Sequence, residues 1–202
     1  MSPIEILAAF FGFVSVWLTI RQHIGCWPTG IIQVILYISI FFEARLYSDM
    51  LLQVFYVFLL AYGWYTWVNG KTSSGELPVT VLPVLKRFFW IQITLIGTLI
   101  LGYIMKTNTR ADFAYLDAWQ TVMSLIAQYL MSFKILESWL LWIAVDILSV
   151  GIYYVKGLYP TTLLYGMFLI MAFMGFFAWQ KAFREASLSS PLPAATTPDK
   201  RE

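Results

Sequence analysis

Two tryptophans and an aspartate stand together in an apolar segment that is long enough to cross a bilayer. Trp139, Trp142 and Asp146 fall at positions i, i+3 and i+7, so an α-helix places them on one face, which Ser149 and Tyr153 extend. An ionisable side chain at membrane depth costs a few kcal/mol even on lenient insertion scales, and it usually faces the interior of a bundle. Two indoles beside a carboxylate favour a binding site. The alternative is a buried structural aspartate with tryptophans at the membrane interface.

Other apolar segments also carry polar side chains at helical spacing. These sets are Gln33 with Tyr37, Gln53 with Tyr56, and Gln120 with Ser124 and Gln128. Such side chains often form hydrogen bonds between membrane helices, worth only about 1 kcal/mol each, and we favour that role for Gln120 and Gln128. We expect ligand contacts from Gln53, which lies in the middle of its segment. The further candidate contacts are Gln33, Tyr37 and Ser124.

The composition indicates an integral membrane protein whose helix bundle is the only domain. Of the 202 residues, 60% are hydrophobic and 12% are charged, about half the charged fraction of soluble domains. The net charge of +2 does not point to nucleic acid. One cysteine, Cys26, allows no internal disulfide, and one histidine, His23, excludes a multi-histidine metal site. No HExxH or GxSxG motif is present, so we expect neither an enzyme nor a cofactor.

Seven segments have about the 20 residues that cross roughly 30 Å of hydrocarbon. They cover residues 3–21, 27–44, 46–68, 88–105, 116–135, 138–158 and 160–180. Trp64 and Trp67 end the third segment and are expected to be interfacial anchors rather than ligand contacts. A polar loop is expected at 69–87, and a disordered cytoplasmic tail at 184–202, which leaves 1–183 as the seven-helix membrane domain.

The distribution of lysine and arginine predicts the orientation in the membrane. The side that holds the N-terminus has four in its loops: Arg45, Lys106, Arg110 and Lys156. The other side has nine: Arg21, Lys71, Lys86, Arg87, Lys134, Lys181, Arg184, Lys200 and Arg201. Because basic residues concentrate on the cytoplasmic side, we expect the C-terminus in the cytoplasm and the N-terminus outside.

The chain contains an internal repeat at an offset of 112 residues. Residues 27–67 lie over residues 139–179 without a gap, and eleven of the 41 positions are identical, including two tryptophans, a tyrosine and a glycine. Segments 1–3 (about 3–68) therefore repeat as segments 5–7 (about 116–180), and 88–105 is a linker helix. The extra helix gives both repeats the same orientation, an arrangement that transporters use with the site where the repeats meet. A receptor or structural bundle built by the same duplication is the alternative.

The two repeats differ where the candidate site lies. Trp142 lies over Gly30, and Asp146 lies over Val34. An indole face attracts a cation, and a carboxylate accepts hydrogen bonds or offsets a positive charge. These residues therefore suit a flat, cationic ligand that carries hydroxyl groups.

Several motifs resemble those of the PnuC family of nicotinamide riboside transporters, over about residues 3–183. They are WPTGIIQVILY, LLQVFYVFLLAYGWYTW, ESWLLW, the acidic position at Asp146, and KGLYPTTLLY. The resemblance implies an all-α 3+1+3 bundle similar to SWEET proteins, and facilitated diffusion of nicotinamide riboside with trapping by a cytosolic kinase in a bacterial inner membrane. It maps the family's W-x-x-W ligand motif onto Trp139 and Trp142. The family often has asparagine where this chain has Asp146, and relatives carry thiamine or riboflavin.

The sequence also allows three alternatives. Thiamine is a second cationic candidate ligand. A seven-helix receptor would bind a ligand without flux, and a retinal protein would need a lysine in the middle of the last span, where none precedes Lys181. We expect a uniporter, because Asp146 is the only carboxylate at depth and neither a sodium site nor a proton relay is evident. The oligomeric state is open, with a homo-oligomer as one alternative.

Overall fold

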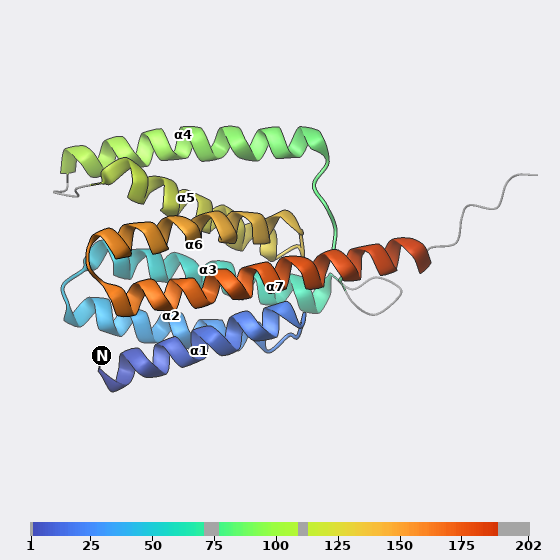
Figure 1. Cartoon of the computed structure of the whole chain (residues 1–202), viewed down its shortest axis with the longest axis horizontal. Coiled ribbons are helices and arrows are strands. Elements are labelled where there is room, and N and C mark those ends of the chain that lie inside the picture. Colours follow the sequence, from blue (N-terminus) through green and yellow to red (C-terminus); the bar gives the residue numbers. More distant parts are fainter. Residues whose placement is uncertain (1, 71–76, 109–112, 190–202) are drawn as a thin grey trace, which may run out of the picture.

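The computed structural model describes residues 2–70, 77–108 and 113–189, and within these ranges the chain is helical apart from short connections. The seven helices are α1 (Pro3–Ile20), α2 (Cys26–Glu43), α3 (Tyr47–Asn69), α4 (Val84–Asn108), α5 (Ala114–Met131), α6 (Glu137–Val155) and α7 (Tyr159–Ser189). Their axes lie roughly along one common direction, and successive helices run up and down it (Figure 1). The N-terminus lies at one end of the bundle, the N-terminal face, and α7 extends beyond the other, the C-terminal face.

Six of the seven helices are long and apolar enough to cross a membrane, and α5 is the exception. It carries Asp117, Gln120, Ser124 and Gln128. Eight of its 18 residues are buried, against three of 18 in α1, its counterpart in the first repeat. A helix that is surrounded by protein meets little lipid, so it need not be apolar on all sides.

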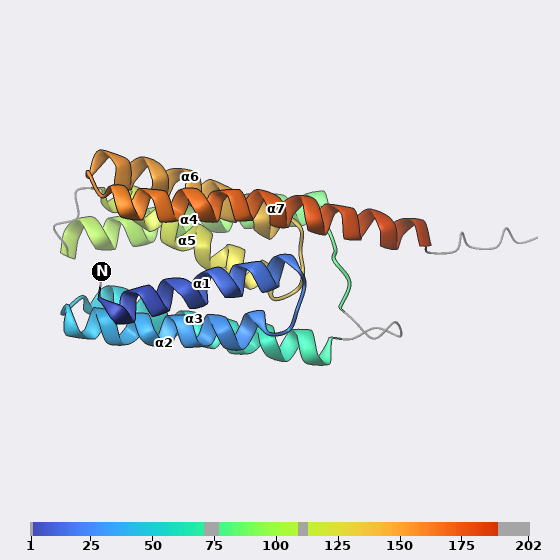
Figure 2. The ribbon, with the colours of Figure 1, turned by 60° about the horizontal axis from the view of Figure 1, so that its bottom comes forward.

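The helices form two groups of three with α4 added to the second (Figure 2). Within the groups, α2 packs against α1 and α3, and α6 packs against α5 and α7. Two contacts join the groups, α1 with α7 and α3 with α5, and the offset of 112 converts one into the other. The fourth helix packs against α5. This is the 3+1+3 arrangement that the repeat predicts.

Backbone geometry follows the same repeat. The described residues with left-handed φ are Gln22 (55°), Arg45 (58°), Lys134 (51°) and Gly157 (71°). They form two pairs, since 134 − 22 and 157 − 45 both equal 112. Each follows the end of a helix, where a left-handed residue turns the chain. The two repeats therefore end their first and second helices in the same way.

The structure differs from the sequence-based expectations at several helix ends: α5 ends at Met131 rather than 135, and α4 continues to Asn108 rather than 105. The last helix continues through Ser189, so residues 184–189 are helical where the disordered tail was expected to begin, and residues 190–202 lie outside the described residues. The linker helix begins at Val84 rather than 88. Before it, Thr80 pairs with the turn ahead of α6: its amide donates to the Lys134 carbonyl, and its carbonyl accepts from the Leu136 amide. Residues 71–76 of the expected loop are not described.

Candidate ligand-binding site

A cavity of about 780 Å³ lies between the two repeats. Residues from α1, α2, α3, α5, α6 and α7 line it, and none from α4 does. The volume falls within the range of small-molecule sites. A second hollow of about 460 Å³ lies between α1 and α7, where Phe13, Val14, Trp17, Met167, Ile170 and Met171 line it. The second hollow offers almost only apolar surface, so the larger cavity is the candidate site.

The stripe on α6 faces this cavity. Trp139, Trp142, Asp146 and Tyr153 all line it. Asp146 is only 5% exposed, and its carboxylate makes no hydrogen bond or ion pair with any residue that the structure describes. A buried charge without a protein partner is costly, so the carboxylate is available to a ligand that supplies a donor or a positive charge.

Three carboxamides complete the polar lining. Gln33 and Gln53, from the first repeat, line the cavity. Gln128 of α5 does so too, although we favoured a helix–helix hydrogen bond for it. None of the three side chains forms a hydrogen bond with the described part of the chain, so each keeps a donor and an acceptor for a ligand. Gln120 does form the helix–helix bond that we expected, donating to the Ser149 hydroxyl at 3.0 Å.

Ser124 is not among the residues that line the cavity, contrary to our expectation of a ligand contact. It accepts a hydrogen bond from the Tyr56 hydroxyl at 2.6 Å and donates to the Thr121 carbonyl at 3.0 Å. Tyr56 does line the cavity, and so does Tyr37. Ser124 thus positions a tyrosine of the lining across the contact between α3 and α5.

Both charged side chains that line the cavity are carboxylates, Asp146 and Glu5. Glu5 lies in the first turn of α1, where it also closes a capping box: Ser2 Oγ accepts from the Glu5 amide at 3.3 Å, and a carboxylate oxygen of Glu5 accepts from the Ser2 amide at 2.8 Å. Two negative charges, with no positive one among the described lining residues, favour a cationic ligand.

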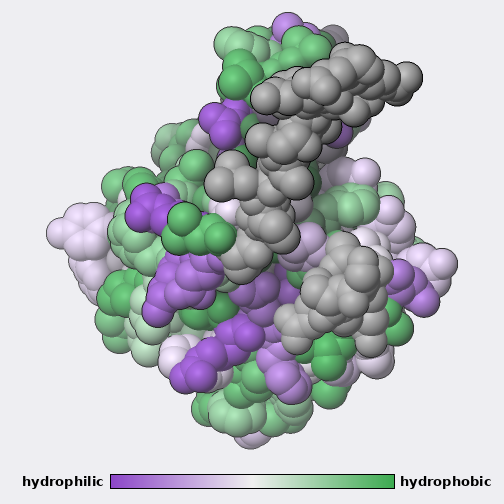
Figure 3. All heavy atoms as spheres, turned by 90° about the vertical axis from the view of Figure 1, so that its right-hand side faces the viewer, coloured by the Kyte–Doolittle hydropathy of each residue, from purple (hydrophilic) through white to green (hydrophobic). Residues whose placement is uncertain are grey.

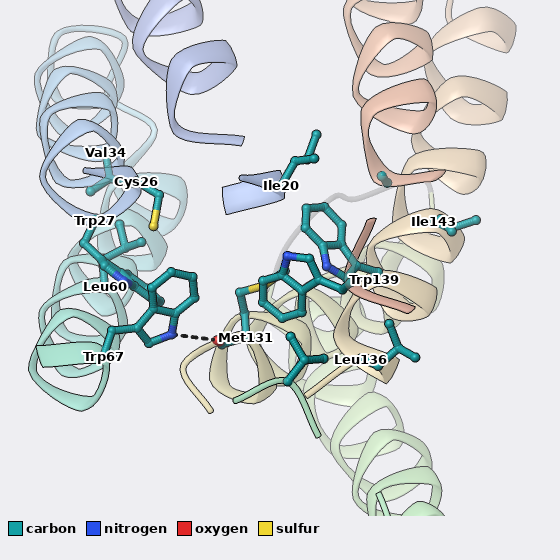
Figure 4. Packing of buried hydrophobic residues seen from close by; sticks show 13 residues of the cluster. Ile20, Cys26, Trp27, Val34, Leu60, Trp67, Met131, Leu136, Trp139 and Ile143 are labelled. Carbon is teal, nitrogen blue, oxygen red and sulfur yellow. Dashed lines mark hydrogen bonds between the residues drawn. The ribbon is translucent and has the colours of Figure 1, made fainter. Parts of the chain in front are cut away.

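Four buried tryptophans close the cavity towards the C-terminal face, and we call them the indole tetrad: Trp27, Trp67, Trp139 and Trp179. Figure 4 labels Trp27, Trp67 and Trp139 among their neighbours in the core. Trp27 and Trp139 line the cavity, whereas Trp67 and Trp179 do not. The expectation that Trp67 is an interfacial anchor is therefore wrong, because the side chain is 5% exposed. Trp64, at 40% exposed, fits the anchor role better.

The tetrad obeys the repeat. Gly63 and Gly175 have no side chains, and this lets Trp27 and Trp139 approach them: a Cβ on either glycine would overlap the facing indole ring. Sequence comparison of the repeats had matched each of these residues to its partner. That match was the signal that Trp27 shares its structural role with Trp139, and Trp67 with Trp179.

The C-terminal face is polar at its centre. Figure 3 shows hydrophilic side chains gathered on this end of the bundle, with hydrophobic ones around them. Lys134, which we counted among the basic loop residues, is 3% exposed and lies inside the protein. Its ammonium stands 4.5 Å from the centre of the Trp67 ring and donates to Gln22 Oε1 at 3.0 Å.

Comparisons with known proteins agree with this architecture. A family model described as nicotinamide mononucleotide transporter matches residues 2–181. The nicotinamide riboside transporter PnuC of Escherichia coli strain K12 is 28% identical over 210 residues, covering 92% of this chain and 88% of that protein. The riboflavin/roseoflavin transporter RibM of Streptomyces davaonensis is 21% identical over 178 residues, covering 87% and 83%.

A solved structure also matches. The crystal structure of the vitamin B3 transporter PnuC superposes with a TM-score of 0.74 at 26% identity, covering 90% of this chain and 82% of that one. This similarity confirms the expected all-α membrane fold. The matched proteins are transporters and not enzymes, as the absence of catalytic motifs had led us to expect.

Proposed function

Because this chain belongs to the nicotinamide mononucleotide transporter family of multi-pass membrane proteins, we propose that it takes up nicotinamide riboside by facilitated diffusion across a bacterial inner membrane. The observation that carries this proposal is the unpartnered Asp146 carboxylate beside Trp142 in the central cavity. Nicotinamide riboside is a flat pyridinium cation with a carboxamide and ribose hydroxyl groups. Each of these groups has a counterpart in the lining.

The indoles and carboxamides supply the rest of the recognition. A cation over an indole face gains about 0.5–2 kcal/mol, and more where water is excluded. Trp139 and Trp142 are the indoles that we assign to the ring. Gln33, Gln53 and Gln128 offer both donors and acceptors to the amide and the hydroxyls.

The charge of the lining favours the riboside over its phosphorylated form. A phosphate monoester adds about −1.5 to −2 charges near pH 7. It would enter a cavity whose charged side chains are the carboxylates of Glu5 and Asp146. We therefore expect nicotinamide mononucleotide to compete poorly. Thiamine is cationic and remains the second candidate, whereas neutral riboflavin would leave Asp146 without a partner.

The orientation and energetics belong to the same proposal. The excess of lysine and arginine on the C-terminal face supports a cytoplasmic C-terminus and an outer N-terminus. Transport is uniport, and a cytosolic kinase traps the riboside as its phosphate. Moving one positive charge inward through 100 mV is worth about 2.3 kcal/mol, which allows roughly 50-fold accumulation.

The test is uptake into proteoliposomes. Labelled nicotinamide riboside should enter, follow an imposed potassium diffusion potential, and ignore gradients of sodium and pH. Unlabelled nicotinamide riboside, thiamine, nicotinamide mononucleotide and riboflavin should then be compared as competitors. Binding without flux would indicate a receptor, and stronger competition by thiamine would replace the substrate. Concentrative uptake driven by a sodium or proton gradient at zero potential would overturn uniport.

A further inference from the structure

The cavity is separated from the C-terminal face by two layers of indoles. Trp27 and Trp139 form the first layer, at the deep end of the cavity. Trp67 packs edge-on against Trp27, with ring centres 5.2 Å apart, and Trp179 packs edge-on against Trp139 at 5.5 Å. The second-layer rings lie 6.2 Å from each other. A ligand that leaves the cavity towards this face has to displace them.

The second-layer indoles also join the two repeats by hydrogen bonds. Trp67 Nε1 donates to the Met131 carbonyl at 3.3 Å, and Figure 4 draws this bond between α3 and the end of α5. Trp179 Nε1 donates to the Thr19 carbonyl at 3.1 Å, between α7 and α1. The offset of 112 converts one bond into the other, since 179 − 67 and 131 − 19 are both 112. Each contact between the repeats therefore carries one such bond.

The first-layer indoles differ in this respect. Trp27 Nε1 and Trp139 Nε1 are buried, and neither has a hydrogen-bond partner in the described residues. An unpaired buried donor is unfavourable. In this structure the second-layer indoles have hydrogen-bond acceptors and the first-layer indoles have none. A rearrangement that breaks the two second-layer bonds can therefore be offset by new hydrogen bonds from Trp27 Nε1 and Trp139 Nε1.

A third pair lies outside the indoles. Gln22 and Lys134 hold equivalent positions in the repeats and bond to each other at 3.0 Å. Because two equivalent residues meet, their contact marks the axis that relates the repeats. The Gln22–Lys134 pair lies over the second indole layer, at the ends of α1 and α5.

We propose that Trp67 and Trp179 are the gating residues on the C-terminal face. Their hydrogen bonds to Met131 and Thr19 hold the repeats together there, with the Gln22–Lys134 pair as an outer layer, and both bonds break when a ligand passes. This assignment rests on the proposed transport function. It adds the two tryptophans as functional residues that need not contact the ligand in the cavity.

The chain carries its own probe for this gate. Cys26 is the one cysteine of the sequence and lines the cavity beside Trp27. A membrane-impermeant maleimide is applied, without substrate, to right-side-out and to inverted membranes. Protease access to a C-terminal tag identifies the preparation in which the C-terminal face is exposed. From that face the maleimide should label Cys26 slowly. Trp67→Phe and Trp179→Phe keep a ring but lose the donor. Each should raise that rate about fivefold and the pair about 25-fold, since about 1 kcal/mol per hydrogen bond corresponds to fivefold.

Matched controls separate the gate from general loosening. Trp64→Phe makes the same change on α3 at an exposed site and should leave the rate unchanged. Cys26→Ser gives the background. The rate of labelling from the N-terminal face should stay within twofold of wild type in every variant that is used to test the gate. Gln22→Asn is a second test with little risk to folding, because asparagine tolerates left-handed φ, and its shorter side chain should lose Lys134 and raise the rate.

Two results would overturn the gate: equal wild-type labelling from both faces, or rates in the double and Gln22→Asn variants that match wild type. The substrate proposal is read separately, by uptake. If the variants open the C-terminal face but nicotinamide riboside is not transported, the gate stands and the substrate assignment fails. If the riboside is transported while the labelling rates do not move, the gate alone fails.

Discussion

Helices α2 and α6 hold equivalent places in the two repeats but present different side chains to the same cavity. Gly30 and Val34 of α2 stand where Trp142 and Asp146 stand in α6, and all four line the cavity. Around them the frame is nearly symmetric, down to the paired glycines and the paired left-handed turns. Duplication thus accounts for the frame, and differences between the repeats, above all at these two positions, account for the chemistry. A ligand with one charged ring and one sugar has no symmetry, so it needs such a site.

The largest effect should come from removing the charge on α6. Asp146→Leu should lower the affinity for nicotinamide riboside by 100-fold or more, because a buried charge pair is worth roughly 3 kcal/mol when one partner is lost. The matched change on α2 is Val34→Leu, which adds one methylene group to the lining and removes no charge, so it should shift affinity by only about tenfold. Asp146→Asn should fold and alter affinity or selectivity. Isothermal titration of the purified proteins measures all three, and wild-type affinity in a well-folded Asp146→Leu protein would reduce Asp146 to a structural residue.

The next effect should come from the indoles. Trp139→Ala and Trp142→Ala should each weaken binding by about 1–3 kcal/mol, the range for stacking on a base. Trp64→Ala, an exposed tryptophan outside the cavity lining, is the control and should leave affinity unchanged. The same titrations report the result. A double variant of Trp139 and Trp142 that elutes as a single species and binds like wild type would refute the assignment.

The symmetry of the repeats predicts equal losses of stability when equivalent glycines are substituted. Gly63→Ala and Gly175→Ala each place a methyl group against an indole of the tetrad, so both should lower the free energy of unfolding, by about 1–3 kcal/mol. Gly151→Ala, with nothing within 4 Å of the added Cβ, should be neutral or slightly stabilising. Denaturation of the detergent-solubilised protein gives the comparison. A cost at one glycine and none at the other would show that the two halves of the tetrad are packed differently.

The smallest effect concerns the hydrogen bond from Tyr56 to Ser124, which joins α3 to α5 and has no equivalent between α1 and α7 in the part of the chain that the structure describes. Tyr56→Phe removes the hydrogen bond to Ser124 and should cost about 1 kcal/mol of stability. At the equivalent positions the chain has Phe168 and Gly12, so Phe168→Tyr offers its hydroxyl to no serine and should gain nothing. A stabilising Phe168→Tyr would mean that the contact between α1 and α7 contains an acceptor we have not identified.

The number of helices could be read from the sequence because lipid requires long apolar spans, and the repeat could be read because the duplication left identical residues at one offset. A span must be long and apolar, and a duplicated frame preserves its tryptophans and glycines. The bounds of α2 and α3 agree with the expected segments to within one residue. The six residues from 184 to 189 were missed because their polar sequence resembles a tail, although it continues a helix already formed.

The site was less predictable, because hydropathy does not say which side of a helix faces protein. Trp67 near the end of a span looks like an anchor until Met131, 64 residues away, accepts its hydrogen bond. Ser124 and Gln128 lie one turn apart on α5, yet only Gln128 lines the cavity. The Ser124 hydroxyl instead accepts a hydrogen bond from Tyr56. Asp146 was recognisable in advance because a carboxylate in a membrane helix is costly and therefore usually faces the bundle interior or a cavity.

The polarity of α5 has a consequence for how the protein is made. A segment that carries an aspartate, two glutamines and a serine is a poor substrate for the translocon on its own. The preceding α4 is apolar, lies next in the chain and packs directly against α5. The two helices are therefore suited to enter the bilayer as a hairpin, with α4 shielding α5 from lipid until α6 and α7 are synthesised. The linker that gives the second repeat its orientation would then also serve as the chaperone for its first helix.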